Sequence, residues 1–171
     1  MNLQSTNLTE IFQSIPLFHG FSSEILFKLA QISHLREIPP QEILFKEGDV
    51  DRTLYILLDG EVKLSCYAPG YGEVIIAKAE PLDIIGWSSM TSMIRQRLET
   101  AQSIRRSTVL CINAEALQKI CDEVPSVGYQ IIQRVANLAA TTLMQSRINL
   151  LQVIREQASQ IHKEDTLEFS E

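Results

Sequence analysis

The stretch TLYILLDGEVKLSCY (residues 53–67) decides the fold class, because it predicts two adjacent β-strands. Asp59-Gly60 stands between two runs of mostly apolar residues. Asp-Gly in that setting is the strongest short-range signal for a hairpin turn. The first expectation is therefore an antiparallel hairpin that turns at these two residues.

The same pattern of strands and turns continues on both sides of this stretch. Short runs of strand-forming residues alternate with turn signals about 8–12 residues apart, which is typical of all-β sandwiches and barrels rather than of alternating β-α units. STVLCIN (107–113) supplies a late strand. The turn signals are Pro39-Pro40, Gly48-Asp49, Asp59-Gly60 and Pro69-Gly70-Tyr71-Gly72.

Helical patterns flank this β-rich region. Before it, LTEIFQSIPLF (8–18) and SEILFKLAQIS (23–33) carry apolar residues at helical spacing, and Ser22 or Ser23 can cap the second helix. After it, residues 114–121 predict a short helix. The expected fold class is mainly β with flanking helices.

Residues 126–161 predict one long helix, because the stretch has no proline and only Gly128 as a breaker. Two adjoining apolar stripes run along it, so it must bury apolar surface on more than one side. We expect one side to cover the β-domain and the other to pair with a second copy in a homodimer. Packing of the whole face within one chain is the alternative. The first stripe contains Ala140, Leu143, Leu150 and Ile154, and the second contains Met144, Ile148, Leu151 and Ala158.

The chain of 171 residues is expected to hold one core and an extra element. Residues 1–125 would form the helices and the β-domain, 126–161 the long helix, and 162–171 a polar, acidic tail.

The composition argues against several classes of function. A formal net charge of −6 disfavours a nucleic-acid-binding surface. No apolar run approaches the roughly 18 residues of a membrane span, and the first residues lack the layout of a signal peptide. We therefore expect a cytoplasmic protein without direct contact to nucleic acid or membrane.

The potentially reactive residues are scattered along the chain. Cys66, Cys111 and Cys121, like the three histidines, lack the spacing of a metal site. The chain also contains no nucleophile elbow, P-loop or dinucleotide fingerprint. The sequence predicts reduced thiols, no metal and no enzymatic activity.

The order of elements, together with three short motifs, resembles the cyclic nucleotide-binding domain of the catabolite activator, related bacterial regulators and kinase regulatory subunits. The likeness runs from about Leu8 to about Ile154. It implies a β-roll, that is, a jelly roll or double-stranded β-helix, followed by a long C-terminal dimerisation helix. The motifs are Glu47-Gly48-Asp49, the pair Leu54-Tyr55-Ile56 and Gly60-Glu61-Val62, and Gly86.

The resemblance also implies a phosphate-binding cassette in DIIGWSSMTSMIRQRLETAQSI (83–104). In the family, a Gly-Glu pair opens a short helix whose N–H groups meet the phosphate, the Glu accepts from a ribose hydroxyl, and an Arg about ten positions later pairs with the phosphate. Gly86 matches the glycine, and a gapless count back from the late strand places Arg97 on the arginine. A register slip of two would exchange Arg97 for Arg95 or Glu99.

Two residues depart from the family's pattern. Trp87 stands where the ribose-binding Glu belongs, and Leu98 replaces the small hydroxyl residue after the arginine. The lost acceptor argues against cyclic AMP bound in the usual way. Trp87 either packs, stacks on a planar ligand or donates its indole N–H. Ser88 and Ser89 still offer hydroxyl and N–H groups for an anion.

The expected function is a regulatory sensor domain that binds a small phosphate-bearing or other anionic ligand and signals through its dimerisation helix. It would lack a helix-turn-helix DNA-binding domain, and no other cofactor is expected. One alternative is a ligand-free interaction or scaffold module for a partner protein, with Trp87 as packing and Arg97 as a solvated charge. Another is the effector-domain fragment of a longer transcription regulator. The candidate ligand residues are Gly86, Trp87, Ser88, Ser89, Arg97 and, on the long helix where the family contacts the ligand base, Thr142.

Overall fold

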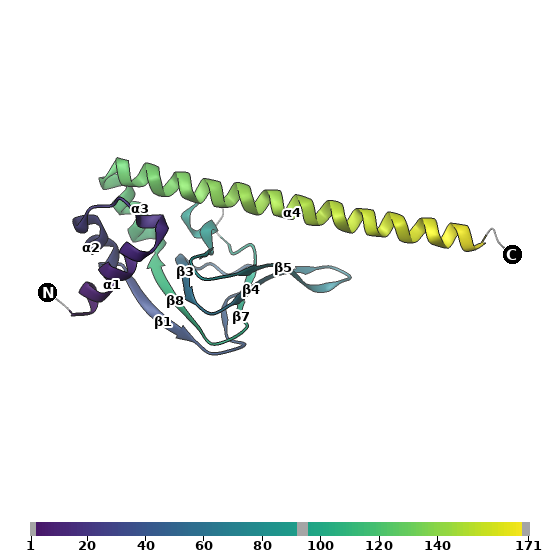
Figure 1. Cartoon of the computed structure of the whole chain (residues 1–171), viewed down its shortest axis with the longest axis horizontal. Coiled ribbons are helices and arrows are strands. Elements are labelled where there is room, and N and C mark those ends of the chain that lie inside the picture. Colours follow the sequence, from purple (N-terminus) through teal and green to yellow (C-terminus); the bar gives the residue numbers. More distant parts are fainter. Residues whose placement is uncertain (1–2, 92–95, 169–171) are drawn as a thin grey trace. The chain divides into compact units, whose positions relative to one another are not determined.

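Two antiparallel sheets form the β-roll that the resemblance implied (Figure 1). The computed structural model describes residues 3–91 and 96–168. In this part of the chain, one sheet has the strand order β1-β8-β3-β6 and the other β2-β7-β4-β5. The expected fold class is confirmed. The strands are β1 (Ser33–Ile38), β2 (Ile43–Phe45), β3 (Thr53–Asp59), β4 (Val62–Ala68), β5 (Gly72–Ala79), β6 (Ile84–Ile85), β7 (Thr100–Ser103) and β8 (Ser107–Asn113).

The predicted hairpin at Asp59-Gly60 is wrong, because the strands on its two sides belong to different sheets. β3 pairs with β6 and β8, whereas β4 pairs with β5 and β7. Gly60 has a φ of 112°, and a Cβ there would lie 2.1 Å from the hydroxyl oxygen of Ser107. The chain thus crosses between the sheets at a point where only glycine fits. The true hairpin joins β4 to β5 through residues 69–71.

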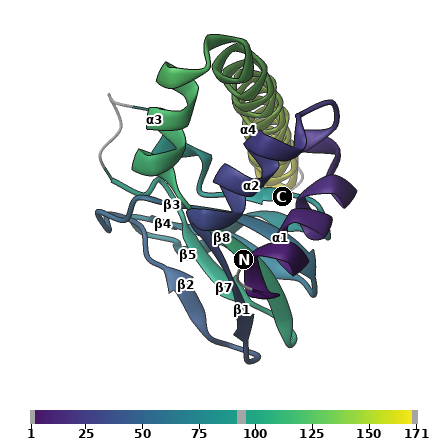
Figure 2. The same cartoon turned by 90° about the vertical axis from the view of Figure 1, so that its left-hand side faces the viewer.

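Three helices gather at one end of the strands (Figures 1 and 2). They are α1 (Leu3–Ser14), α2 (Ser23–Gln31) and α3 (Ala114–Glu123), and the short 3-10 helix η1 (Pro16–Phe18) follows α1. The Ser22 hydroxyl accepts a hydrogen bond from the Ile25 N–H, so Ser22 caps α2. The short helices expected from the sequence are therefore present.

Alternate residues of β3 face two separate apolar clusters, which explains why its sequence is continuously apolar. Leu54 and Ile56 pack with the helices. Tyr55 and Leu57 pack between the two sheets with residues of β2, β4 and β7. Strand β3 is consequently packed against apolar side chains on both of its faces.

Helix α4 (Pro125–Glu168) belongs to two compact units, residues 1–135 and residues 136–171. The long helix predicted for 126–161 lies within α4, and residues 162–168, expected as a tail, are helical. In the first unit, Val127, Ile131 and Val135 are buried. In the second unit, from Leu143 onward, the large apolar side chains of the described residues are exposed, namely Leu143, Met144, Ile148, Leu150, Leu151, Val153 and Ile154.

In the described part of the chain, no helix is both long and apolar enough to cross a membrane. Cys66, Cys111 and Cys121 are free thiols.

The contact between α3 and α4 predicts an unusual response to a glycine substitution. A Cβ at Gly128 would lie 2.7 Å from the carbonyl oxygen of Cys121. We expect Gly128→Ala to lower the free energy of unfolding by about 1–3 kcal/mol, because overpacking outweighs the better helix propensity of alanine. Urea denaturation measures this change. Ser146→Ala on an exposed turn of α4 is the control and should stay within about 0.5 kcal/mol of the parent. A neutral Gly128→Ala would contradict the close approach.

Candidate ligand site

The cassette stretch begins at a glycine in the left-handed region. Gly86 follows β6 with φ 74° and ψ 33°, and it precedes the short 3-10 helix η2 (Trp87–Met90). A Cβ at Gly86 would lie 2.2 Å from Nη1 of Arg97. Both the backbone conformation and the neighbouring guanidinium therefore require glycine here.

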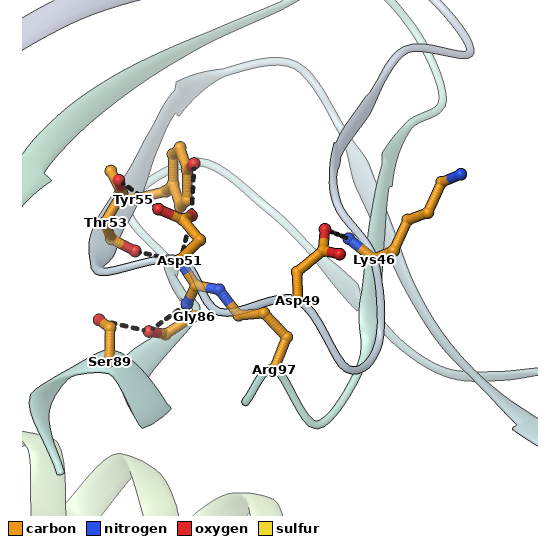
Figure 3. Close-up of polar contacts among 8 residues, drawn as sticks. All are labelled: Lys46, Asp49, Asp51, Thr53, Tyr55, Gly86, Ser89 and Arg97. Carbon is orange, nitrogen blue, oxygen red and sulfur yellow. Dashed lines mark hydrogen bonds and ion pairs between the residues drawn. The ribbon is translucent and has the colours of Figure 1, made fainter. Parts of the chain in front are cut away.

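Arg97 is the centre of the site, and only 2% of the residue is exposed. Its Nη1 donates to the carbonyl oxygen of Gly86 at 2.9 Å, and its Nη2 donates to Asp51 Oδ2 and to the Thr53 carbonyl oxygen, each at 2.6 Å (Figure 3). The guanidinium carbon lies 4.1 Å from the ring centroid of Phe45, a distance that allows a cation–π interaction. The alternative in which Arg97 is a solvated surface charge is wrong.

Asp51 is the partner that the sequence did not single out. Its carboxylate accepts hydrogen bonds from Arg97, from the Thr53 hydroxyl at 2.8 Å and from the Tyr55 hydroxyl at 3.0 Å (Figure 3). Burial raises the pKa of Asp51, but the hydrogen bonds and the charge of Arg97 outweigh burial and leave that pKa below its usual value. Asp51 is thus ionised at neutral pH and balances the buried arginine.

Tyr55 is held in its protonated form by the same cluster. Burial, followed by the charge of Asp51 and the hydrogen bond to it, raises the pKa of Tyr55 to about 12. The phenol therefore remains a donor to Asp51 at any physiological pH.

The backbone around Arg97 is fixed by the motif Glu47-Gly48-Asp49. The Gly48 N–H donates to the Arg97 carbonyl oxygen at 2.9 Å, and the Arg97 N–H donates to the Asp49 carbonyl oxygen at 2.8 Å. The Asp49 carboxylate in turn accepts from the Lys46 N–H at 2.8 Å (Figure 3). This motif thus positions the main chain from which the arginine projects.

The other cassette residues lie in the short helix η2. Trp87 is half-buried and packs against the cluster formed by the helices and β3. Ser88 and Ser89 are buried, and the Ser89 hydroxyl donates to the Gly86 carbonyl oxygen at 2.8 Å. Gly86 O therefore accepts from both Ser89 and Arg97.

Three further residues were named from the sequence. Leu98 is exposed. Thr142 belongs to the second unit, is exposed, and donates its hydroxyl to the Leu138 carbonyl oxygen at 3.0 Å, as a threonine in a helix often does. Arg95 lies outside the described residues.

Nε of Arg97 is buried without a hydrogen-bond partner in the described part of the chain. Glu99, two residues further on, is also buried, with 9% exposure, and this burial raises the pKa of its carboxyl group. Nothing local in the sequence marked Glu99 as buried, because a charged residue beside a turn is ordinarily solvated.

The site presents a buried, oriented guanidinium whose Nε–H has no acceptor in the described part of the chain. No group of three or more His, Cys, Asp or Glu side chains that could hold a metal occurs among the described residues.

The pair of Arg97 and Asp51 predicts a pH-dependent loss of stability. We expect Asp51→Asn to lower the free energy of unfolding at pH 7 by about 2–3 kcal/mol, less than for a fully buried pair because the Asp51 side chain is 31% exposed. Because folding lowers the pKa of Asp51, its contribution is present above the unfolded pKa and disappears as pH falls through the folded pKa. Urea denaturation between pH 7 and pH 3 should therefore show parent and variant converging in acid.

Asp59→Asn is the matched control for this substitution. Asp59 lies 4.0 Å from Arg105 in an exposed pair, which is worth less than about 1 kcal/mol. An equal effect of the two substitutions would contradict the central role of Asp51.

Comparison with known proteins agrees with the fold. The family model of the cyclic nucleotide-binding domain matches residues 35–124, just over half of the chain. A cyclic nucleotide-binding domain from Methylobacillus flagellatus KT superimposes with a TM-score of 0.72 at 26% identity, covering 86% of this chain and 83% of that one. The catabolite activator protein of Thermus thermophilus gives 0.65 at 25% identity, covering 84% of this chain and 65% of that one.

The relatives also include much longer proteins. Neuropathy target esterase sws of Drosophila grimshawi is 26% identical over 133 residues, which are 72% of this chain and 9% of the esterase. The chain thus spans less than a tenth of that relative, and the likeness concerns this one domain. From the family match and the β-roll, we conclude that the chain belongs to the cyclic nucleotide-binding domain family.

Proposed function

We propose that this domain is a regulatory sensor, not an enzyme, that binds a small anionic ligand at the cassette and signals through a dimer formed by α4. The observation that carries the ligand site is the unpaired Nε–H of the buried Arg97. A buried donor without a partner costs about 1–3 kcal/mol, and a ligand oxygen would remove that cost.

The setting of Arg97 favours binding because the side chain is already ordered. Gly86, Asp51 and Thr53 hold both terminal nitrogens, so a ligand would not have to immobilise the side chain. The charge of Arg97 is shared with Asp51, which weakens its pull on an anion. We therefore expect the site to bind an anionic ligand with moderate affinity.

A ligand-free module is the second candidate, and two observations favour it. Both terminal nitrogens of Arg97 already have protein acceptors. Trp87 packs against the core where the family places its ribose acceptor. In that case the surface of the domain, rather than its interior, would meet a partner protein.

Ligand-induced stabilisation separates the two candidates. We expect inorganic phosphate or 3′,5′-cyclic AMP at about 100 times its Kd to raise the melting temperature by about 5–10 °C, because a ligand that binds only the folded state stabilises it. Arg97→Lys keeps the charge but removes Nε–H, and it should abolish the shift.

Arg106→Lys is the control for the arginine substitution. Arg106 forms an exposed pair with Glu37 at 3.6 Å, so the exchange should leave both stability and ligand response unchanged. If millimolar probes do not raise the melting temperature of the parent protein, the ligand-free module is the function that remains.

The proposed dimer rests on the second unit of α4. Exposed Leu143, Leu150 and Ile154, with Ala140 and with Arg147 as the polar member, recur at three- and four-residue steps, as in helices that pair along an apolar seam. A binding event would act by favouring one arrangement of the paired helices, and its effect is limited by the difference in affinity between arrangements.

Analytical ultracentrifugation tests this dimer. Leu150→Glu should shift the chain toward monomer by placing a charge in the seam, whereas Ser146→Glu, outside both stripes, should leave the dimer intact. A parent protein that sediments as a monomer at all concentrations would refute the dimer.

A further inference from the structure

We infer that an open groove at one end of the sheet β1-β8-β3-β6 binds a small neutral polyol of the size of a monosaccharide. The groove has a volume of about 450 Å³, which lies within the range of small-molecule sites. None of the candidate ligand residues of the cassette lines this groove. The inference therefore goes beyond the proposed function and does not depend on it.

The walls of the groove are the adjoining ends of three strands. Ser33 is the first residue of β1, Thr53 is the first of β3, and Asn113 is the last of β8. Both outer strands run antiparallel to β8, and Thr53 lies directly opposite Asn113. The Asn113 N–H also donates to the carbonyl oxygen of Ile32 at 3.1 Å. The walls are thus held in place by the fold itself, which lowers the cost of ordering them on binding.

Hydrogen bonds within the protein set the polarity of three side chains that line the groove. The Ser33 hydroxyl donates to the Leu29 carbonyl oxygen at 2.7 Å, and the Thr53 hydroxyl donates to Asp51 at 2.8 Å. Because each hydroxyl proton is already used, these two oxygens can meet a ligand only as acceptors. Asn113 accepts an N–H of α3 through Oδ1 at 2.8 Å, so its NH₂ group is the part that can donate.

This lining favours a neutral polyol over a charged ligand. Among the described residues that line the groove, none is Asp, Glu, Lys or Arg, so a charged group would find no counter-charge there. Neighbouring hydroxyl groups both donate and accept, which matches two acceptors beside one donor. Ile32 and Ala116 add an apolar wall for the C–H groups of a ring, and Gln31 and His34 add further polar groups.

Thr53 connects the groove to the buried arginine of the cassette. Its carbonyl oxygen accepts from Nη2 of Arg97 at 2.6 Å, while its hydroxyl donates to Asp51, the partner of that arginine (Figure 3). A polyol that donates to the Thr53 hydroxyl would therefore bind directly beside the pair of Arg97 and Asp51. Occupation of the groove should be felt at the guanidinium.

A nuclear magnetic resonance titration tests the site, with D-ribose, D-glucose and myo-inositol as probes of the ¹⁵N-labelled protein. We expect at least one probe to shift the N–H resonances of Ser33, Thr53 and Asn113 along a saturating curve with a Kd of about 1–10 mM, because a few neutral hydrogen bonds give weak binding. If all shifts stay linear up to about 100 mM, the inference is overturned, since excluded polyols act on proteins without a site.

A charged analogue tests the chemical class of the ligand. In D-glucuronate a carboxylate replaces the hydroxymethyl group of glucose, and the groove offers this carboxylate no cationic lining residue. We expect D-glucuronate to bind no more tightly than D-glucose. Tighter binding of D-glucuronate would overturn the assignment to a neutral ligand.

Two variants locate the binding in the groove. Ser33→Ala removes one acceptor and should weaken binding about two- to tenfold, and Ala116→Phe should abolish it by filling the space. Ser14→Ala is the matched control, because the Ser14 hydroxyl donates to the Ile11 carbonyl oxygen at 2.7 Å at the end of α1, away from the groove. If Ala116→Phe fails to fold, Ser33→Ala decides. Equal affinity of Ser33→Ala and the parent protein would overturn the inference.

The side-chain Nε–H resonance of Arg97 tests the connection through Thr53. It should move with the same Kd as the groove resonances when a polyol is added, whether or not the cassette binds an anion. An unchanged Arg97 resonance at a saturated groove would overturn the connection.

Discussion

The buried guanidinium of Arg97 is the interaction on which the site depends. It connects the segment before β7 to the Asp51 loop, to the backbone of β3 at Thr53 and to the left-handed turn at Gly86. An unpaired charge in that position would cost several kcal/mol, so the carboxylate of Asp51 is needed for the arginine to be buried at all. Gly86 is needed for a steric reason, because any side chain at position 86 would occupy the space of the guanidinium.

The pKa values of the two acidic residues near this arginine, Asp51 and Glu99, are shifted in opposite directions. Asp51 accepts hydrogen bonds from Arg97, Thr53 and Tyr55 and has a lowered pKa, whereas burial raises the pKa of Glu99. The first carboxylate stabilises the folded state, and the second opposes it when ionised.

The helix α4 combines two kinds of apolar residue within one element. In the first unit, Val127, Ile131 and Val135 of this helix are buried. From Leu143 onward, its large apolar side chains are exposed in the described residues of the second unit. One continuous helix therefore carries both a packed segment and an exposed apolar surface.

Local sequence signals predicted much of this structure. The strand Ser107–Asn113, the caps and apolar faces of the short helices, and the long proline-free helix depend on residues within a few positions of each other. The resemblance likewise pointed to Gly86 and Arg97. The turn at Asp59-Gly60 was foreseen, but its partner strands were not, because turn chemistry is local while strand pairing is decided across the whole chain.

The sequence by itself therefore determined most of the elements and the mainly β class, since these follow from periodicity and turn residues. The resemblance to a known family indicated the β-roll, and the cassette that it also implied stays a prediction. Only the tertiary structure decided which charges are buried and which are paired. Asp51 and Arg97 are separated by 46 positions, and their contact exists only once the sheets have closed. The burial of Glu99 has the same origin, because the exposure of a side chain depends on distant segments that fold over it.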